Sequence, residues 1–283
     1  MAQSRVWLIT GATRGLGFDM AKVALKAGHK VIACHRGKPG NTSNWDQLEA
    51  LGGIWTHLDV SSEDAESKVK ALVAEHGRID VLVNNAGYAV MGSVEDVPLD
   101  KVNAIFNTNV VGTLRTIKGV LPSMREHKTG TIVNISSSIT FSPIPALGIY
   151  TATKLALEGY TEALQAEVAA FGIRVLLVEP GATATDFASD KGSGIRVESS
   201  EPYQEGIIKY IASMMSPSQF ASNGATSADV AERVVEAIDG TGSMAGKEIG
   251  LRLPLGKDTG SDLEKRAAMF QDLANLKDVW GSV

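Results

Sequence analysis

The amino-acid sequence predicts an α/β protein, built on a doubly wound parallel sheet of about seven strands between two layers of helices. Short, continuous runs rich in Val, Ile and Leu alternate with helix-length segments, and such runs are typical of strands buried on both faces. This alternation favours parallel strands joined by right-handed crossovers. The expected strands are Val6–Thr10, Lys30–Cys34, Gly53–Asp59, Asp80–Asn84, Gly130–Ser136, Ile173–Glu179 and Glu248–Leu253.

Apolar residues at helical spacing predict the helices between these strands. The first covers Gly15–Ala27 and ends at Gly28, where a helix favours a C-terminal glycine. Further helices are expected over Leu99–Arg125, Tyr150–Phe171 and, within a long insertion, Pro202–Met215. Because long insertions in compact domains usually serve as lids or binding loops, we expect one domain over residues 1–283 with a substrate-binding lid at about 187–226. The alternative is that this insertion is a floppy surface loop with no part in binding.

Composition excludes several classes of protein. The 283 residues carry 27 Lys and Arg against 32 Asp and Glu, a formal charge of −5. The chain thus lacks the excess of basic residues that proteins binding nucleic acid usually carry. One cysteine excludes an intrachain disulfide. No apolar run approaches the roughly 18 residues that span a bilayer, and no signal-peptide core is present. We therefore expect a cytoplasmic protein with no membrane and no nucleic-acid partner.

A glycine-rich turn directly follows the first strand and opens the first helix. Thr10–Gly17 contains glycines spaced Gly-x3-Gly-x-Gly. Glycines there permit a tight turn and close approach of a pyrophosphate to backbone N–H groups at a helix N-terminus. The turn predicts a Rossmann-type dinucleotide site, although a purely structural turn is the alternative. Its expected cofactor contacts are Gly11, Thr13, Arg14, Gly15, Leu16 and Gly17.

The end of the second strand indicates which dinucleotide is bound. An acidic residue at this place usually holds the ribose hydroxyls of NAD, but here His35 and Arg36 occupy it. No carboxylate repels a 2′-phosphate, and the Arg36 guanidinium can pair with one, with Arg14 as a second cation. We therefore expect NADP(H) as the cofactor; two merely solvated arginines are the alternative.

Polar and small residues also end the next two strands. Asp59 and Val60 can hold the adenine edge, and Asn85, Ala86 and Gly87 allow close backbone approach to the ribose. Each of these groups alone is weak evidence for a binding site. Together they mark the carboxyl ends of successive strands, where open α/β sheets bind ligands.

A Tyr-x3-Lys motif supplies the candidate acid and base. Tyr150 and Lys154 lie four residues apart, on one face of a helix. An ammonium near a phenol favours the phenolate, which would lower the tyrosine pKa from about 10. Ser137, at the end of the fifth strand, can offer its hydroxyl to a substrate oxygen. It belongs to a run of three serines, and a shift to Ser136 or Ser138 remains an alternative.

These motifs resemble the short-chain dehydrogenase/reductase family, in its short-form, NADP-preferring branch. The matching segments run in the family's order from residue 6 to about 186. The resemblance implies strand order 3-2-1-4-5-6-7 and a catalytic tetrad in which Asn109 joins Ser137, Tyr150 and Lys154. It implies that Tyr150 protonates the carbonyl, Ser137 polarises it, and Lys154 holds the nicotinamide ribose. Further cofactor contacts that the resemblance implies are Tyr150, Lys154, Pro180, Gly181, Thr183 and Thr185.

The expected substrate wall is mostly apolar, which suits a hydrophobic ketone or aldehyde; the alternative is that several of these residues only pack the lid. The family often has a glycine three residues after the catalytic serine, whereas this chain has Thr140, which is expected to intrude on the substrate. The candidate substrate contacts are Met91, Ser137, Phe141, Ile144, Leu147 and Phe187.

The sequence thus predicts an NADPH-dependent carbonyl reductase that acts reversibly on a small carbonyl or alcohol substrate, without a metal. Two alternatives remain: an NADP-dependent alcohol dehydrogenase that works oxidatively, and a non-catalytic NADP-sensing binding protein. The helices Leu99–Arg125 and Tyr150–Phe171 carry apolar residues on more than one face and resemble the family's dimer interface. A homodimer or homotetramer is therefore expected, with a monomer as the alternative.

Overall fold

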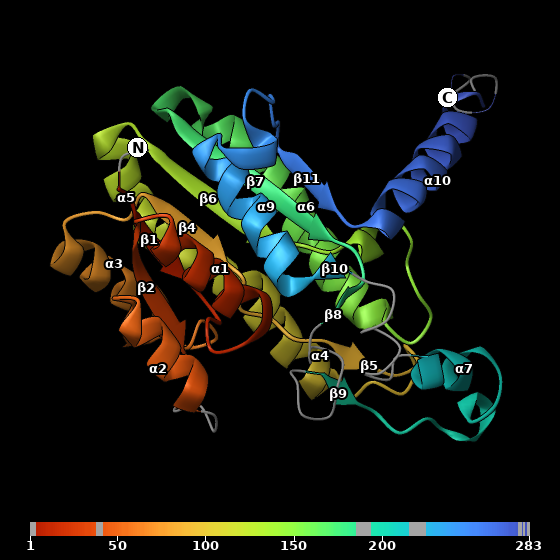
Figure 1. Ribbon diagram of the computed structural model, residues 1–283. Coiled ribbons are helices and arrows are strands. Elements are labelled where there is room, and N and C mark those ends of the chain that lie inside the picture. Colours follow the sequence, from red (N-terminus) through yellow and green to blue (C-terminus); the bar gives the residue numbers. More distant parts are fainter. Residues whose placement is uncertain are drawn as a thin grey trace.

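A seven-stranded parallel sheet forms the centre of the protein in the computed structural model, which describes residues 4–37, 42–184, 194–214, 225–276, 279 and 281. The strand order is β11-β7-β6-β4-β1-β2-β3 (Figure 1). The predicted fold class is confirmed. The strands are β1 (Val6–Ile9), β2 (Lys30–His35), β3 (Ile54–His57), β4 (Val81–Asn84), β6 (Gly130–Ile135), β7 (Ile173–Pro180) and β11 (Arg252–Leu255).

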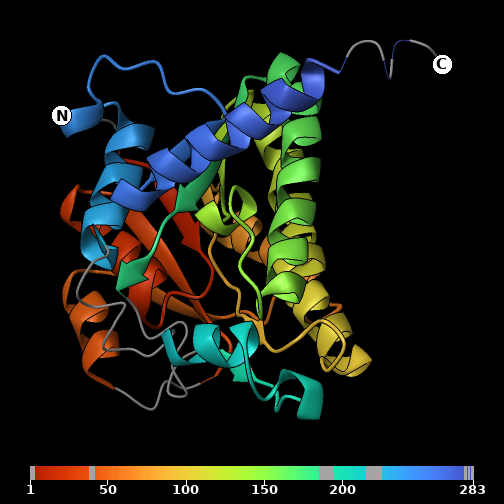
Figure 2. The ribbon, with the colours of Figure 1, turned by 90° about the vertical axis from the view of Figure 1, so that its right-hand side faces the viewer.

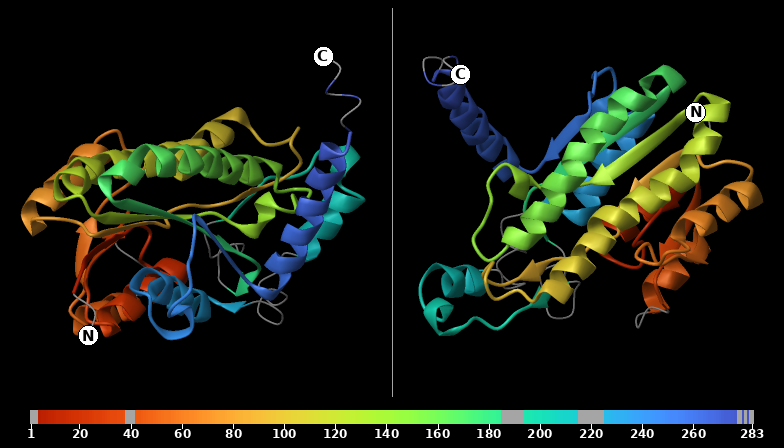
Figure 3. Two further views of the ribbon diagram at one scale, coloured as in Figure 1. Left: turned by 90° about the horizontal axis from the view of Figure 1, so that it is seen from above. Right: turned by 180° about the vertical axis from the view of Figure 1, so that it is seen from behind.

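Helices cover both faces of the sheet, which explains why its strands are apolar on both sides. Successive side chains of a strand alternate between two cores: Trp7 and Ile9 enter one, and Leu8 enters the other. Figure 2 shows α9 and α6 on opposite sides of the sheet, and the left panel of Figure 3 shows the three layers. One face carries α1 (Gly15–Lys26), α2 (Thr42–Ala50) and α9 (Ser227–Asp239); the other carries α3 (Ala65–His76), α5 (Gly112–His127) and α6 (Gly148–Val168).

The helix predicted over Leu99–Arg125 consists of three segments. A π-helical turn, Asn107–Val111, separates α4 (Leu99–Phe106) from α5. Such turns insert one extra residue into the helical repeat and are frequent at functional sites. Here the turn contains the buried Asn109. The predicted helix Tyr150–Phe171 begins earlier, as α6, and its last turn, Ala169–Phe171, is a 3₁₀ helix.

Two short parallel pairs lie beside the main sheet. One joins β5 (Val90–Met91) to β9 (Ile195–Arg196), and the other joins β8 (Thr183–Ala184) to β10 (Ala225–Thr226). The predicted lid, 187–226, lies only partly within the described residues. There, the helix predicted over Pro202–Met215 is a 3₁₀ turn, Glu201–Tyr203, and a separate helix, α7 (Ile207–Met214), with Gly206 between them at φ +81°. Met215 lies outside the described residues.

The last strand begins later than the sequence predicted. The expected strand started at Glu248, but β11 starts at Arg252, which pairs with Leu177 of β7. Residues 248–250 are half-buried or exposed, since they lie outside the stretch that pairs with β7. The final helix, α10 (Lys257–Ala274), extends away from the sheet (Figure 3). No helix in the described ranges is long and apolar enough to cross a membrane.

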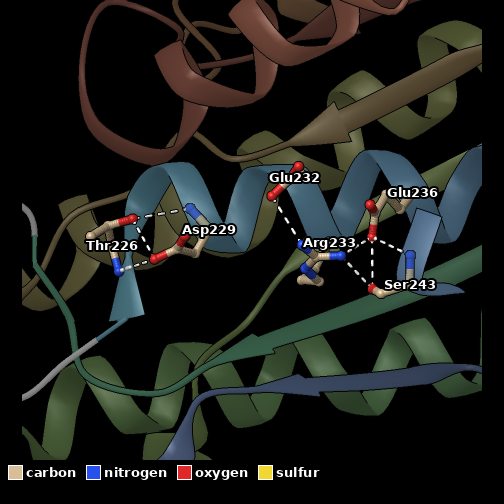
Figure 4. Close-up of polar contacts among 6 residues, drawn as sticks. All are labelled: Thr226, Asp229, Glu232, Arg233, Glu236 and Ser243. Atoms are coloured by element: carbon tan, nitrogen blue, oxygen red, sulfur yellow. Dashed lines mark hydrogen bonds and ion pairs between the residues drawn. The ribbon is translucent and has the colours of Figure 1, made fainter.

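Helix α9 is fixed at both ends by side chains (Figure 4). At its start, Thr226 and Asp229 form a reciprocal capping box, which satisfies two backbone N–H groups. At its other end, Arg233 and Ser243 both bind the Glu236 carboxylate. Ser227, the first residue of α9, donates to Asp19 of α1 at 2.5 Å. The Ser227–Asp19 contact ties the start of α9 to α1.

Candidate active site

A large cleft of about 1150 Å³ follows the carboxyl ends of the strands. The loops after β1, β2, β3, β4, β6 and β7 all contribute to it, as expected where ligands bind in open α/β sheets. Most of the predicted cofactor residues line this cleft. They are Gly11, Thr13, Arg14, Gly15, Leu16, His35, Arg36, Asp59, Val60, Asn85, Ala86, Gly87, Tyr150, Lys154, Pro180, Gly181 and Thr183; Thr185 lies outside the described residues.

The glycine turn uses its glycines in two ways. Gly11 and Gly15 have φ of +64° and +55°, a left-handed region that favours glycine. Gly17, in contrast, is buried behind the turn and is not among the residues that line the cleft. A Cβ there would collide with the Asn85 amide and the Gly11 carbonyl. Asn85 itself donates to the carbonyls of Thr10 and Gly11 at 3.0 and 3.1 Å, which ties β4 to the turn.

Two cations lie where the loops after β1 and β2 line the cleft. The exposed side chains of Arg14 and Arg36 both line it. Their neighbour His35 is half-buried against aromatic rings: its ring centroid lies 5.0 Å from that of Trp45 and 5.6 Å from that of His57. Burial lowers the pKa of His35; its hydrogen bond with the Gly37 carbonyl opposes this shift, and the nearby His57 adds to it. His35 therefore favours the neutral form, and the positive charge there comes from the arginines.

Tyr150 and Ser137 meet where α6 begins beside the end of β6. Tyr150 is 7% exposed. Its burial raises the pKa of the phenol, and a hydrogen bond with Ser137 acts in the opposite direction. The Tyr-x3-Lys spacing predicts a tyrosine pKa lowered by the lysine, but burial dominates here. The phenol is thus held protonated, the form that a general acid needs.

Lys154 lies one helical turn after Tyr150. Its Nζ is 5.6 Å from the centroid of the Tyr150 ring and donates to the Ile135 carbonyl at 2.7 Å. Burial lowers the pKa of Lys154 to about 8, and the Glu158 carboxylate opposes this shift. The amine is therefore fixed at the junction of β6 and α6, next to the phenol.

The hydroxyls of the consecutive serines Ser136 and Ser137 have different partners. Ser136 donates to Glu158 at 2.6 Å. Ser137 interacts with Tyr150, and its Oγ also accepts from the Ile139 N–H at 3.3 Å. Ser138 begins the 3₁₀ turn Ser138–Thr140. Of the three, Ser137 thus has the contact with Tyr150 that the Tyr-x3-Lys motif requires.

Asn109 lies behind the cleft and does not line it. Its amide donates to the Tyr88 carbonyl at 2.9 Å and to Thr153 Oγ1 at 3.1 Å, and its oxygen accepts from the Tyr88 N–H at 3.1 Å. A Cβ on Gly87 would lie 3.1 Å from Asn109 Oδ1 and 3.9 Å from Lys154 Nζ. Asn109 therefore supports the loop after β4 at the point where Lys154 approaches it.

Only some of the predicted substrate contacts line the cleft. Met91, Ser137, Ile144 and Leu147 line it, whereas Phe187 lies outside the described residues. Two residues lie differently from the expectation. Phe141 is not among the residues that line the cleft, whereas Ser138 and Ile139 of the 3₁₀ turn are. Thr140 does not intrude either: it is 2% exposed, and its hydroxyl donates to the Ser137 carbonyl at 2.9 Å.

Several cleft residues were missed by the sequence analysis. Asp258 and Asp262 reach it from α10, and Arg196 from β9. Asp258 accepts from the Ala182 N–H at 2.8 Å and so fixes the loop after β7. An acid in the first turn after Gly256 signals a helix start, but no local pattern places that helix against residues so distant in sequence. No cluster of His, Cys, Asp or Glu suited to a metal ion occurs in the described parts of the chain.

Comparison with known proteins agrees with this geometry. A family model described as short chain dehydrogenase matches residues 5–195. "Oxidoreductase claN" of Passalora fulva is 44% identical over 187 residues, which cover 66% of this chain and 85% of that protein. Human "Retinol dehydrogenase 8" is 33% identical over 250 residues, 85% of this chain and 79% of that protein.

A solved structure is similar over nearly the whole chain. A short-chain dehydrogenase from Streptomyces avermitilis superposes with a TM-score of 0.85 at 32% identity, covering 99% of this chain and 98% of that one. The chain therefore belongs to the short-chain dehydrogenase family. It is an oxidoreductase acting on CH–OH and C=O groups, and its family uses NAD or NADP.

Proposed function

We propose that the protein is an NADPH-dependent carbonyl reductase that converts a hydrophobic ketone or aldehyde reversibly to its alcohol. The observation that carries this proposal is one continuous cleft with Ser137, Tyr150 and Lys154 at one end and Arg14 and Arg36 at the other. Met91, Ile144 and Leu147 supply its apolar wall.

The residues present fit a dinucleotide. Gly11 and Gly15 adopt φ values that favour glycine and open the backbone beside a helix N-terminus. The cleft, at about 1150 Å³, exceeds the roughly 300–1,000 Å³ of ordinary ligand pockets, which leaves room for coenzyme and substrate together. Arg14 and Arg36 would pair with a 2′-phosphate, and Lys154 would hold the nicotinamide ribose. When bound, the coenzyme supplies the hydride.

Residues of the protein itself deliver the proton and stabilise the charge that its transfer leaves behind. In reduction, Tyr150 donates its phenolic proton to the carbonyl oxygen as that oxygen gains negative charge. Ser137 donates a hydrogen bond to the same oxygen and orients it. Lys154 presents a positive charge beside the tyrosine, which stabilises the phenolate left behind. Asn109 maintains the loop after β4 against which Lys154 lies.

A second copy of the chain is part of this proposal. Helix α4 continues end to end into α5 through the π-helical turn, and α6 lies beside them on the face seen in the right panel of Figure 3. Val111, Leu114 and Leu155 on this face are 37–42% exposed. Burial of this surface in a homodimer or homotetramer would remove apolar area from water. Light scattering coupled to gel filtration tests it, and a mass near 30 kDa would contradict it.

The activity is tested by NADPH oxidation against a panel of apolar ketones and aldehydes, with Tyr150→Phe as the matched variant. Loss of the phenolic proton is expected to lower kcat by about 10²–10⁴-fold while NADPH binding persists. Tyr160→Phe, which removes a hydroxyl from the same helix outside the cleft, is the control. NADPH binding without turnover of any carbonyl would overturn the proposal, and so would an active Tyr150→Phe enzyme.

A further inference from the structure

A stripe of titratable side chains runs along one face of α6. Tyr150, Lys154, Glu158 and Glu162 follow one another at intervals of four residues, which places them on one side of the helix. The first three are buried, and Glu158 is only 5% exposed. The mechanism uses Tyr150 and Lys154 but assigns nothing to Glu158. A carboxylate is costly to bury unless it is paired and hydrogen-bonded.

Both oxygens of Glu158 have partners. Oε1 accepts from Ser136 Oγ at 2.6 Å, and Oε2 accepts from Arg252 at 3.0 Å. Ser136 lies between two residues of the site: Ser137 follows it, and the carbonyl of Ile135 accepts from Lys154. The end of β6 is thus tied to α6 at two consecutive residues directly before Ser137.

Arg252 supplies the cation for this group from the last strand of the sheet. Besides Glu158, it pairs with Glu162 on α6 and with Glu179 on β7. Within the described chain, the cluster therefore sets three carboxylates against one guanidinium, and Lys154 stands one helical turn away from Glu158. The excess negative charge favours a charged amine at Lys154.

We propose that Glu158 is a positioning residue for carbonyl reduction, which keeps Lys154 charged and holds the Ser136–Ser137 backbone beside Tyr150. This inference rests on the proposed function for the roles of Lys154 and Tyr150. The pKa of Lys154 agrees with this arrangement, because burial lowers that pKa and the charge on Glu158 counteracts the effect. The titratable or charged groups around Glu158 are Lys154 and Glu162 on α6, Glu179 on β7 and Arg252 on β11.

The test follows the titration of Lys154 in the coenzyme-free protein, by NMR of [ε-¹³C]lysine-labelled chain with Lys154→Met for assignment. Glu158→Gln keeps an acceptor for Ser136 but removes the charge. It is expected to shift the Lys154 titration down by about one pH unit, since an opposite charge at close range is worth about that or more. Glu162→Gln is the matched control, because this residue shares the helix and the Arg252 contact but is separated from Lys154 by two turns.

A parallel measurement follows kcat for carbonyl reduction against pH. The alkaline limb is expected to move to lower pH in Glu158→Gln and to stay in place in Glu162→Gln. Should Glu158→Gln not fold, Arg252→Met provides the opposite perturbation, and the Lys154 titration is expected to rise. A Lys154 titration unchanged in the folded variant overturns the inference. A shifted titration in an enzyme that turns over no carbonyl overturns the proposed function and leaves Glu158 as the group that sets the Lys154 charge.

Discussion

The side chain of Asn109 and the backbone of Tyr88 form a closed pair of hydrogen bonds. Asn109 accepts from the Tyr88 N–H at 3.1 Å and donates to the Tyr88 carbonyl at 2.9 Å. Both groups of one residue's backbone are thus satisfied by one amide side chain, as a neighbouring strand would do. The π-helical turn at Asn107–Val111 gives Asn109 the position from which it reaches this loop.

Asn109→Ala is therefore expected to destabilise the protein by roughly 2–4 kcal/mol, because it leaves both Tyr88 groups without their partner. Urea unfolding monitored by circular dichroism measures this change. Asn103→Ala, an exposed asparagine on α4, is the control and should stay within about 0.5 kcal/mol of the parent. Equal stability of the two variants would show that the two Asn109–Tyr88 hydrogen bonds do not stabilise the protein.

Two glycine-to-alanine substitutions are expected to have opposite effects. At Gly17 a Cβ meets the Asn85 amide and the Gly11 carbonyl, so Gly17→Ala should cost about 1–3 kcal/mol of stability through overpacking. At Gly260, inside α10, a Cβ meets no atom within 4 Å. Gly260→Ala should stabilise by about 0.5–1 kcal/mol, since alanine favours the helix. Thermal unfolding of both variants in parallel distinguishes them, and the same sign for both would contradict the packing argument.

Arg36→Ala is expected to reduce discrimination between the two coenzymes. A guanidinium that pairs with the 2′-phosphate contributes about 1.5–3 kcal/mol, or roughly 10- to 150-fold in affinity. Titration of the protein's tryptophan fluorescence with NADPH and NADH gives both dissociation constants. That for NADPH should rise by this factor, while that for NADH stays near its starting value. Arg125→Ala, on the exposed last turn of α5, is the control, and a parent that binds both coenzymes equally would refute the preference.

Glu179 should make stability depend on pH. Burial raises the pKa of its carboxyl from 4.5 to about 7, against the opposing charge of Arg252. Between these two pH values the folded protein binds more protons than the unfolded chain, so stability falls as pH rises from about 4.5 to 7. Glu179→Gln removes this proton and should flatten the decline.

Urea unfolding of the coenzyme-free protein at pH 5, 6, 7 and 8 measures the slope. Glu264→Gln, exposed on α10, should retain the parent's dependence. Parallel curves for the parent and Glu179→Gln would mean that Glu179 is ionised in the folded state throughout this range.

Local pattern was enough to predict the parts of the site that strand ends supply. The strand–turn–helix at Thr10–Gly17 and the helical spacing of Tyr150 and Lys154 each need only neighbouring residues, and the cleft contains both motifs. The parallel arrangement followed from the alternation of apolar runs, because buried parallel strands require crossovers.

The features that sequence did not predict depend on contacts between distant segments. Arg252 meets Glu158 across 94 residues of chain, and Asp258 meets Ala182 across 76. The pairing of β11 with β7 likewise decides where that strand starts. The 3₁₀ turn that leaves Phe141 out of the cleft lining is a matter of backbone geometry, to which a hydrophobicity pattern is insensitive.

The position of Arg252 late in the chain has a consequence for biosynthesis. Glu158 and Glu179 are made long before the guanidinium that pairs with both of them. Until the last strand has left the ribosome, these two acids lack their guanidinium partner. They can then be buried only in protonated form, and otherwise they stay exposed to water. The emergence of Arg252 would thus set when these acids can be buried as ions, and with it when the end of the cleft that holds Tyr150 and Lys154 becomes complete.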